Sequence, residues 1–177
     1  DTSTNDTVLL MANGVSGAVV KGTEAETRFQ SLLEDVCISL TRAMVRDGEG
    51  VSTLVELKVV GAASDEDALR IADTVAHSPL VKTAIFGRDA NWGRIMMAAG
   101  RAGVVFDPDK TDIFFDDVMV VNGGMGVGAE AEARAARVMH NPEITLTIDL
   151  NMGGGAAAML TCDFSVEYVK INADYRS

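Results

Sequence analysis

Residues 143–150 read Glu-Ile-Thr-Leu-Thr-Ile-Asp-Leu (EITLTIDL), and this stretch decides the class of fold. Apolar and polar side chains alternate along it, which is the pattern of a strand with one buried face. The glycines at 153–155 then predict a turn into a second strand at 156–164, so we expect a hairpin. Residues 129–139, upstream, are rich in alanine and glutamate and predict a helix.

The mixture of strands and helices continues toward the N-terminus. Thr23 is placed to cap a long amphipathic helix that ends at Gly48, and Ser64 with Asp67 indicates the start of another helix. Residues 80–86 are ambiguous between strand and helix. Further strands are expected at 7–12 (TVLLMA), 53–60 (TLVELKVV), 113–115 and 118–121, and further helical segments at 92–102 and 165–171.

This order of elements lacks strict βαβ regularity, so we predict an α+β fold, a layered mixed α/β sandwich. A chain of 177 residues is long enough to bury its own core without disulfides or metals. The best internal boundary is the GAAS stretch at 61–64. We therefore expect residues 1–60 to form one part of the protein and residues 61–177 a second α/β region.

The charge and composition exclude several classes of function. A net charge of −11 repels phosphate backbones and anionic membranes and favours cationic ligands. The two cysteines and two histidines share no spacing typical of a metal site, so we expect no metal. No apolar stretch approaches the ~20 residues that a membrane span needs. Asp1 begins a polar segment unlike a signal peptide, so we expect a cytoplasmic protein whose natural N-terminus lies elsewhere.

Three segments carry side chains that could form a site, and each also has a purely structural interpretation. Residues 1–7 (DTSTNDT) crowd polar groups before an apolar stretch, but ordinary turns do so too. Glu49 lies between two glycines after the long helix, where a solvated loop carboxylate is the simpler interpretation. In residues 87–94 (GRDANWGR), Arg88 or Arg94 could bind a carboxylate and Trp92 could line a pocket, or the loop could be an Arg–Asp network around a buried indole.

The glycine-rich residues 123–128 (GGMGVG) contain a G-x-G pattern. No P-loop lysine follows it, and no acidic residue lies at the distance that dinucleotide binding requires. We therefore interpret the segment as a turn and expect no nucleotide cofactor. From these residues alone, function remains undecided beyond an acidic α+β domain.

Four longer segments, taken in order, resemble one family closely. They are DTSTNDTVLLMANG at 1–14, SPLVKTAIFGRDANWGR at 78–94, EITLTIDLNMG at 143–153 and VKINADYRS at 169–177. Together they resemble the C-terminal part of the β chain of glutamate N-acetyltransferase, the ornithine acetyltransferase of arginine biosynthesis. The resemblance runs from the first residue to the last.

This resemblance implies a self-processing enzyme of the N-terminal-nucleophile-like type. A precursor cuts itself before a threonine, and the new N-terminal threonine of the β chain takes the acetyl group from N2-acetylornithine and transfers it to glutamate. Its own amine can act as base for its hydroxyl. Some members also accept acetyl-CoA, and no other cofactor is implied. The partner is the α chain of the same precursor, in an αβ heterodimer that assembles into a higher oligomer.

The resemblance assigns substrate-binding roles to Glu49, Asn172 and Ser177. Ser177 replaces the family's C-terminal threonine and keeps its hydroxyl. The family's nucleophile segment, A-T-L-L, and the oxyanion-hole pair are absent from these residues, so we expect no catalytic residue here and no turnover by this stretch alone. The alternatives are a related hydrolase or aminopeptidase and a non-catalytic module that binds amino acids. Asn5, Asp6, Asn91 and Trp92 match the motifs but receive no role.

Overall fold

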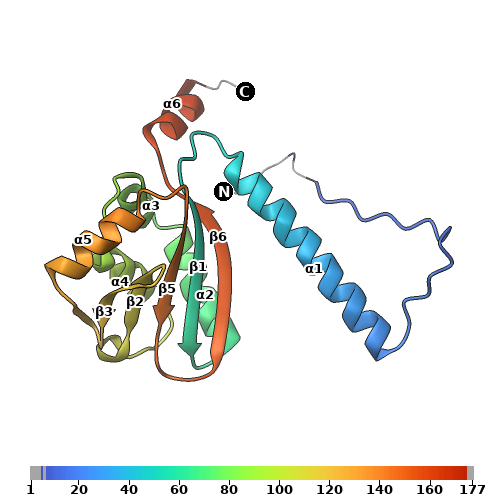
Figure 1. Cartoon of the computed structure of the whole chain (residues 1–177), viewed down its shortest axis with the longest axis horizontal. Coiled ribbons are helices and arrows are strands. Elements are labelled where there is room, and N and C mark those ends of the chain that lie inside the picture. The colour runs from blue at the N-terminus through green and yellow to red at the C-terminus, as the bar shows by residue number, and fades with distance from the viewer. Residues whose placement is uncertain (1–4, 6, 175–177) are drawn as a thin grey trace. The chain divides into compact units, whose positions relative to one another are not determined.

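The structure is a computed structural model that describes residue 5 and residues 7–174 (Figure 1). Its contacts divide the chain into two compact units, Asp1–Ile38 and Ser39–Ser177. Helix α1 (Thr23–Arg46) contributes residues to both. The division expected at 60/61 differs from this one, because strand β1 (Leu54–Ala62) runs through that point. Residues before and after it belong to one strand, which pairs with β5 (Glu143–Asp149) and β6 (Gly155–Cys162).

In the first unit, residues 7–22 form neither helix nor strand. The strand expected at 7–12 is therefore wrong for this structure. A strand forms when another strand pairs with its backbone groups, and nothing within the described part of the chain does so here. As a result Val8, Leu9 and Met11 leave their side chains 85%, 76% and 87% exposed.

Helix α1 begins at Thr23, as predicted, and ends at Arg46, two residues before Gly48. Glu24 and Glu26 lie in its first turn, where the helix dipole favours negative charge. The predicted amphipathic pattern is present, but none of the helix's residues is buried. Its apolar face is exposed along its length, at Phe29, Leu32, Val36, Leu40 and Met44.

The second unit is built on one six-stranded sheet with the strand order β4-β3-β2-β5-β1-β6. At its centre β1 pairs parallel with β5, so that Leu57 lies beside Leu146, and antiparallel with β6, so that Leu57 lies beside Met159. The other strands are β2 (Asp112–Phe115), β3 (Val118–Asn122), β4 (Met125–Gly126), β5 (Glu143–Asp149) and β6 (Gly155–Cys162). The hairpin predicted around Asp116 is confirmed as β2 and β3.

The hairpin expected between β5 and β6 is wrong, because β1 lies between them. Both strands form, but the glycine turn that joins them passes the end of β1 instead of closing a pair. The backbones come very close there: a Cβ atom on Gly153 would lie 2.5 Å from the carbonyl oxygen of Ala62. The glycines thus allow a crossing of backbones that strand periodicity does not reveal.

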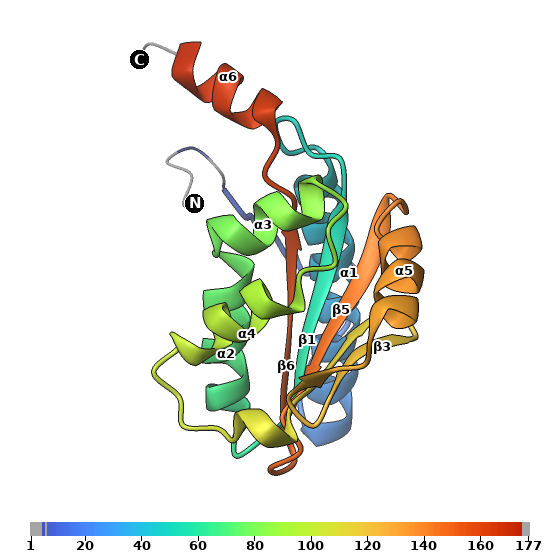
Figure 2. The same cartoon turned by 90° about the vertical axis from the view of Figure 1, so that its left-hand side faces the viewer.

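Helices α2 (Asp65–Ala76), α3 (Pro79–Phe86) and α4 (Trp92–Gly100) lie together on one side of the sheet (Figure 2). The Ser64 cap is confirmed, since its hydroxyl accepts a hydrogen bond from the Asp67 amide at 3.2 Å. The ambiguous stretch at 80–86 is helical, with Ser78 as N-cap and Pro79 in the first turn. Short helix η1 (Pro108–Lys110) precedes β2, α5 (Ala129–Val138) packs on β3, and α6 (Val166–Asp174) follows β6.

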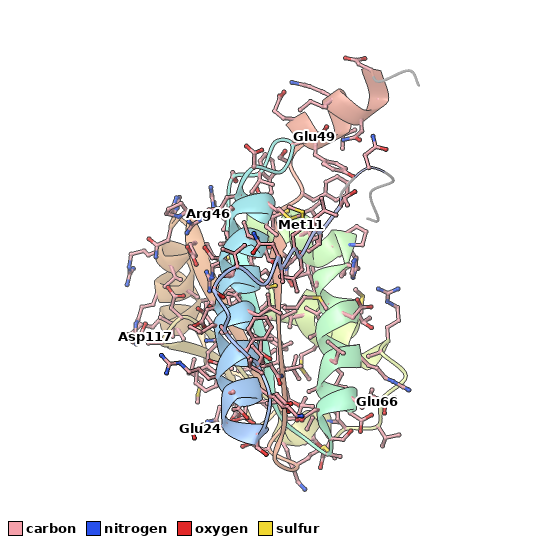
Figure 3. All side chains as sticks on the ribbon, turned by 90° about the vertical axis from the view of Figure 1, so that its right-hand side faces the viewer. Met11, Glu24, Arg46, Glu49, Glu66 and Asp117 are labelled. Atoms are coloured by element: carbon pink, nitrogen blue, oxygen red, sulfur yellow. The ribbon has the colours of Figure 1, made fainter. Side chains whose placement is uncertain are left out.

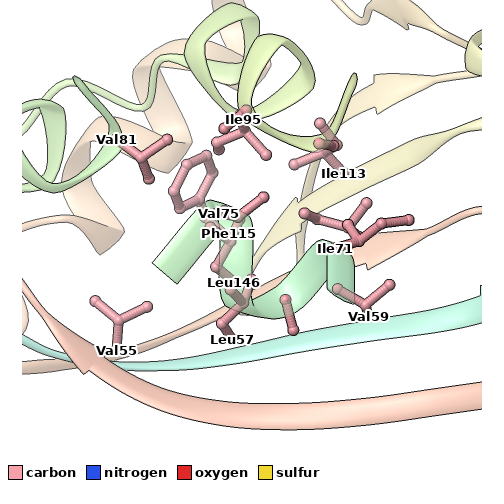
Figure 4. Close-up of a cluster of buried hydrophobic side chains, with 14 of the residues drawn as sticks. Val55, Leu57, Val59, Ile71, Val75, Val81, Ile95, Ile113, Phe115 and Leu146 are labelled. Atoms are coloured by element: carbon pink, nitrogen blue, oxygen red, sulfur yellow. The ribbon is translucent and has the colours of Figure 1, made fainter. Parts of the chain in front are cut away.

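The core lies between the sheet and helices α2 to α4. Figure 4 shows Phe115 among aliphatic side chains from several elements, including Ile95 and Leu146. Each of these residues is at most 3% exposed. Burying a large apolar side chain contributes about 1.5–3 kcal/mol, so this core holds the sheet and its helices as one body. The predicted α+β fold of layered sheet and helices is confirmed.

Candidate functional site

The loop that carries Glu49 runs from the end of α1 to the start of β1. Arg42, near the end of α1, donates hydrogen bonds to Glu56 at 2.9 Å and to Glu143, while Arg46 also donates to Glu143. The hydrogen bond that Arg42 donates to Glu56, together with the nearby carboxylate charges, raises the pKa of the Arg42 guanidinium. The end of the helix is thereby tied to the first residues of β1 and β5.

The residue after Glu49 must be a glycine, Gly50, for two reasons. Its φ of +68° lies in the left-handed region, which glycine adopts without strain. A Cβ atom at this position would lie 2.6 Å from the hydroxyl oxygen of Ser165 and 2.7 Å from the amide nitrogen of Tyr168. Only glycine allows the loop to pack against the start of α6.

The side chain of Asn172, on α6, contacts Glu49, on the loop that packs against α6. Its Nδ2 donates to Oε2 of Glu49 at 2.7 Å and to the carbonyl oxygen of Tyr168 at 2.9 Å. Glu49 lies beside α6 in Figure 3. The two residues are 123 positions apart in the chain, yet the fold brings them into contact. The third residue of the expected set, Ser177, lies outside the described residues.

The start of α6 is held by local contacts. The Ser165 hydroxyl accepts a hydrogen bond from the Tyr168 amide at 3.1 Å, and the rings of Phe164 and Tyr168 pack edge to face with centroids 4.8 Å apart. Further along α6, Ile171 is 42% exposed and does not belong to the core.

The pair formed by Glu49 and Asn172 is chemically suited to a polar, cationic ligand. Both side chains are exposed, and Glu49 Oε1 accepts no hydrogen bond within the described part of the chain. A carboxylate oxygen of this kind binds an ammonium group strongly, because the hydrogen bond is assisted by charge. The net charge of −11 favours the same ligands.

The arginines of residues 87–94 are occupied by the protein itself. The Arg88 guanidinium donates to the hydroxyl of Thr53, to the carbonyl oxygen of Met139 at 2.7 Å and to the hydroxyl of Ser52 at 3.4 Å. Arg94 donates to the carbonyl oxygen of Leu80 at 3.0 Å. Both arginines therefore hold backbone and hydroxyl groups, instead of the Arg–Asp network or the free carboxylate site considered from the sequence.

The other residues of this segment shape a cavity. Asn91 caps α4 by accepting from the Arg94 amide at 3.1 Å, and its Nδ2 donates to Asp89 at 3.0 Å. Trp92 lines a cavity of about 610 Å³ together with Asp89, Asn91 and, from α5, Glu132. Of the two interpretations left open by the sequence, the one in which the indole lines a pocket agrees with this cavity.

The glycine-rich residues 123–128 form turns and close contacts. A Cβ atom on Gly124, whose φ is +76°, would lie 2.4 Å from the carbonyl oxygen of Pro108, and one on Gly126 would lie 3.1 Å from the Trp92 ring. Gly126 also belongs to β4. These contacts account for the glycines by packing, which supports the interpretation as a turn.

Two other kinds of feature are absent from the described residues. Residue 5 and residues 7–174 contain no group of three His, Cys, Asp or Glu side chains arranged to hold a metal ion. None of the helices within the same residues has the length and apolar character needed to cross a membrane.

Comparison with known proteins identifies the family. The model of the ArgJ family matches residues 1–177, which is the whole chain. This chain belongs to the ArgJ family. The resemblance drawn from the four sequence segments is thereby confirmed.

Relatives in the ArgJ family match the chain along its entire length. The arginine biosynthesis bifunctional protein ArgJ of Geobacter sulfurreducens is 52% identical over 179 residues, and that of Desulfotalea psychrophila is equally similar. In both cases the match covers 100% of this chain and 46% of the relative. The chain thus spans about half the length of the curated relatives it matches.

A solved ArgJ structure supports the fold independently. The crystal structure of the arginine biosynthesis bifunctional protein ArgJ from Bacillus halodurans matches 99% of this chain and 83% of that chain, with a TM-score of 0.91 and 36% sequence identity. The predicted class, an α/β fold of the N-terminal-nucleophile-like type, agrees with this similarity.

Proposed function

We propose that this chain is the C-terminal part of the β chain of an acetyltransferase that moves an acetyl group from N2-acetylornithine to glutamate. Membership of the ArgJ family supports the reaction class, and the chain's share of its relatives, 46%, supports its being one part of a longer enzyme. The observation that carries the proposal is the contact between Glu49 and Asn172. The resemblance to the family assigns both residues to substrate binding.

Glu49 binds the substrate's positive charge in this proposal. The α-amine of N2-acetylornithine is acylated and therefore neutral, which leaves its side-chain ammonium as the cation. Oε1 of Glu49 is the oxygen available to it, while Asn172 holds Oε2 at 2.7 Å and fixes the direction of the carboxylate. Ser177 is proposed to bind the α-carboxylate, and Asn172, whose two N–H groups are donated to Glu49 and to the carbonyl oxygen of Tyr168, contributes by orienting Glu49.

The reacting groups lie upstream of this chain in the same proposal. The hydroxyl of the N-terminal threonine attacks the acetyl carbonyl, the C–N bond of the amide breaks, and the released amine of ornithine takes up a proton. The acetyl-threonine ester is then attacked by the amine of glutamate, which restores the hydroxyl. The residues of this chain bind and orient the substrate, and none of them forms a bond to the acetyl group.

The partner we propose is the α chain of the same precursor, in an αβ heterodimer that assembles further. The exposed apolar side chains at 8–11 and along α1 support this, because large contiguous apolar surfaces are typical of interfaces. Nucleic acid and membranes are not partners in this proposal, and the enzyme acts in the cytoplasm. Acetyl-CoA is a second acetyl donor to be tested.

The test is an assay of the full-length enzyme with N2-acetylornithine as donor. Ornithine release that depends on added glutamate, with N-acetylglutamate as the second product, supports the transferase. Release of acetate without an acceptor would instead identify a hydrolase. Binding of acetylornithine without any product would identify a non-catalytic module. Replacing acetylornithine by acetyl-CoA in the same assay decides the second donor.

A further inference from the structure

Asp163 lies between β6 and α6 and is only 4% exposed. Its Oδ1 accepts hydrogen bonds from the Ser52 amide at 2.9 Å and the Thr53 amide at 3.0 Å. Its Oδ2 accepts from the Ser52 hydroxyl at 2.5 Å. A buried carboxylate is costly unless donors surround it. Here all three donors come from the loop that carries Glu49, so the Asp163 carboxylate binds that loop.

Arg88 holds the same two residues from another element. Its φ of 58° is unusual for a residue with a side chain, and glycine would adopt it with less strain. The Arg88 side chain gives a reason to keep an arginine there, since its guanidinium donates to the hydroxyls of Thr53 and Ser52. Ser52 and Thr53 are therefore held by an anion and a cation at once.

The segment that holds Ser52 also starts the helix that carries Asn172. Ser165 follows two residues after Asp163, and its hydroxyl lies so close to residue 50 that only a glycine fits there. Asp163 thus lies where the Glu49 loop and α6 are joined, and both members of the Glu49–Asn172 pair depend on this junction. No sequence pattern singled out Asp163, because its partners are about 110 positions away.

We propose that Asp163 is a positioning residue for substrate binding: through Ser52 and Thr53 it sets Glu49 at hydrogen-bonding distance from Asn172. This inference rests on the proposed function for its kinetic readout, though its structural part can be measured without it. A role in positioning, instead of in global stability, follows from where the bonds go. The hydrogen bonds of the Asp163 carboxylate join a loop to the end of a strand. The pairing of β1 with β6 begins at Leu54 opposite Cys162 and does not involve this carboxylate.

The test is Asp163→Asn in the full-length enzyme, which keeps the shape of the side chain but removes the charge and one acceptor. We expect KM for acetylornithine to rise about tenfold, with kcat changed less than about twofold and self-cleavage intact. Asp112→Asn is the matched control. The Asp112 carboxylate also accepts from a backbone amide (Gly123, 2.7 Å) and a side-chain amide (Asn151, 2.9 Å), but it lies outside the Glu49 loop, so KM should stay at the wild-type value.

A double variant separates positioning from a direct effect. If Asp163 acts through Glu49, Asp163→Asn adds almost nothing to KM once Glu49→Gln is present. Fully additive effects would overturn the proposal. Should Asp163→Asn fail to fold, Ser52→Ala removes the hydroxyl's bonds to Asp163 and Arg88, keeps the two backbone amides bonded to Asp163, and should raise KM about threefold. An unchanged KM in that variant would equally overturn it.

Hydrogen exchange makes the result independent of the enzyme's reaction. Should Glu49→Gln leave KM unchanged, the proposed role of Glu49 in substrate binding fails, and the amides of Ser52 and Thr53 then report on the positioning alone. Faster exchange of these two amides in Asp163→Asn, with unchanged exchange in β5, supports the junction described here. Equal exchange in variant and wild type would refute it.

Discussion

Replacing Glu49 by glutamine tests the candidate site most directly. Glutamine keeps the length of the side chain and an acceptor oxygen for Asn172 Nδ2, which lies 2.7 Å from Oε2 in the structure. What it removes is the negative charge that faces the substrate's ammonium. A hydrogen bond to a charged group contributes about 1.5–3 kcal/mol, which corresponds to a fall of ~10–150-fold in kcat/KM. Self-cleavage should be unaffected, because the proposed role of Glu49 is in substrate binding.

The assay measures initial rates of ornithine release by the full-length enzyme over a range of acetylornithine concentrations, with gel electrophoresis to follow self-cleavage. Glu66→Gln is the control. Glu66 is also an exposed glutamate on this chain, and it pairs with Arg70 at 2.7 Å within α2 (Figure 3). An exposed pair of this kind contributes little, so that variant should keep wild-type kinetics. If Glu49→Gln keeps a wild-type kcat/KM, Glu49 is a solvated loop carboxylate and the proposed role is refuted.

Three further outcomes are expected. The 177-residue chain by itself should give no acetyl transfer from acetylornithine to glutamate, and turnover by a preparation free of α chain would contradict the upstream nucleophile. Deleting residues 173–177 from the full-length enzyme should raise KM for acetylornithine sharply at little cost in stability. Ser177→Thr should leave KM and stability nearly unchanged. A wild-type KM after the deletion would exclude a role for the tail. Gly50→Ala should lower the melting temperature more than Gly14→Ala does. Both positions have positive φ, but only at Gly50 would the new Cβ meet other atoms, 2.6 Å from the Ser165 hydroxyl. Equal shifts in melting temperature would contradict the close packing of the loop.

Local sequence patterns determined most of the elements correctly. The Ser64 cap, the hairpin around Asp116 and the strand at β5 all formed where the pattern predicted them, whereas residues 80–86 stayed ambiguous until the structure showed helix α3. Each depends on residues within a few positions of one another, such as a hydroxyl that accepts from an amide three residues on. The motifs also identified the family, and the resemblance assigned Glu49 and Asn172 separately to substrate binding, which stays a prediction.

Tertiary structure decided what depends on distant partners. Strand periodicity predicted β5 and β6 but not that β1 separates them. Residues 7–12 have a strand's composition, but none of the described strands pairs with them. The contact of Glu49 with Asn172 and the bonds of Asp163 to Ser52 and Thr53 each join residues more than 100 positions apart. Such contacts depend on which strands are neighbours and on where the backbone turns, and side-chain patterns along a single segment carry neither kind of information.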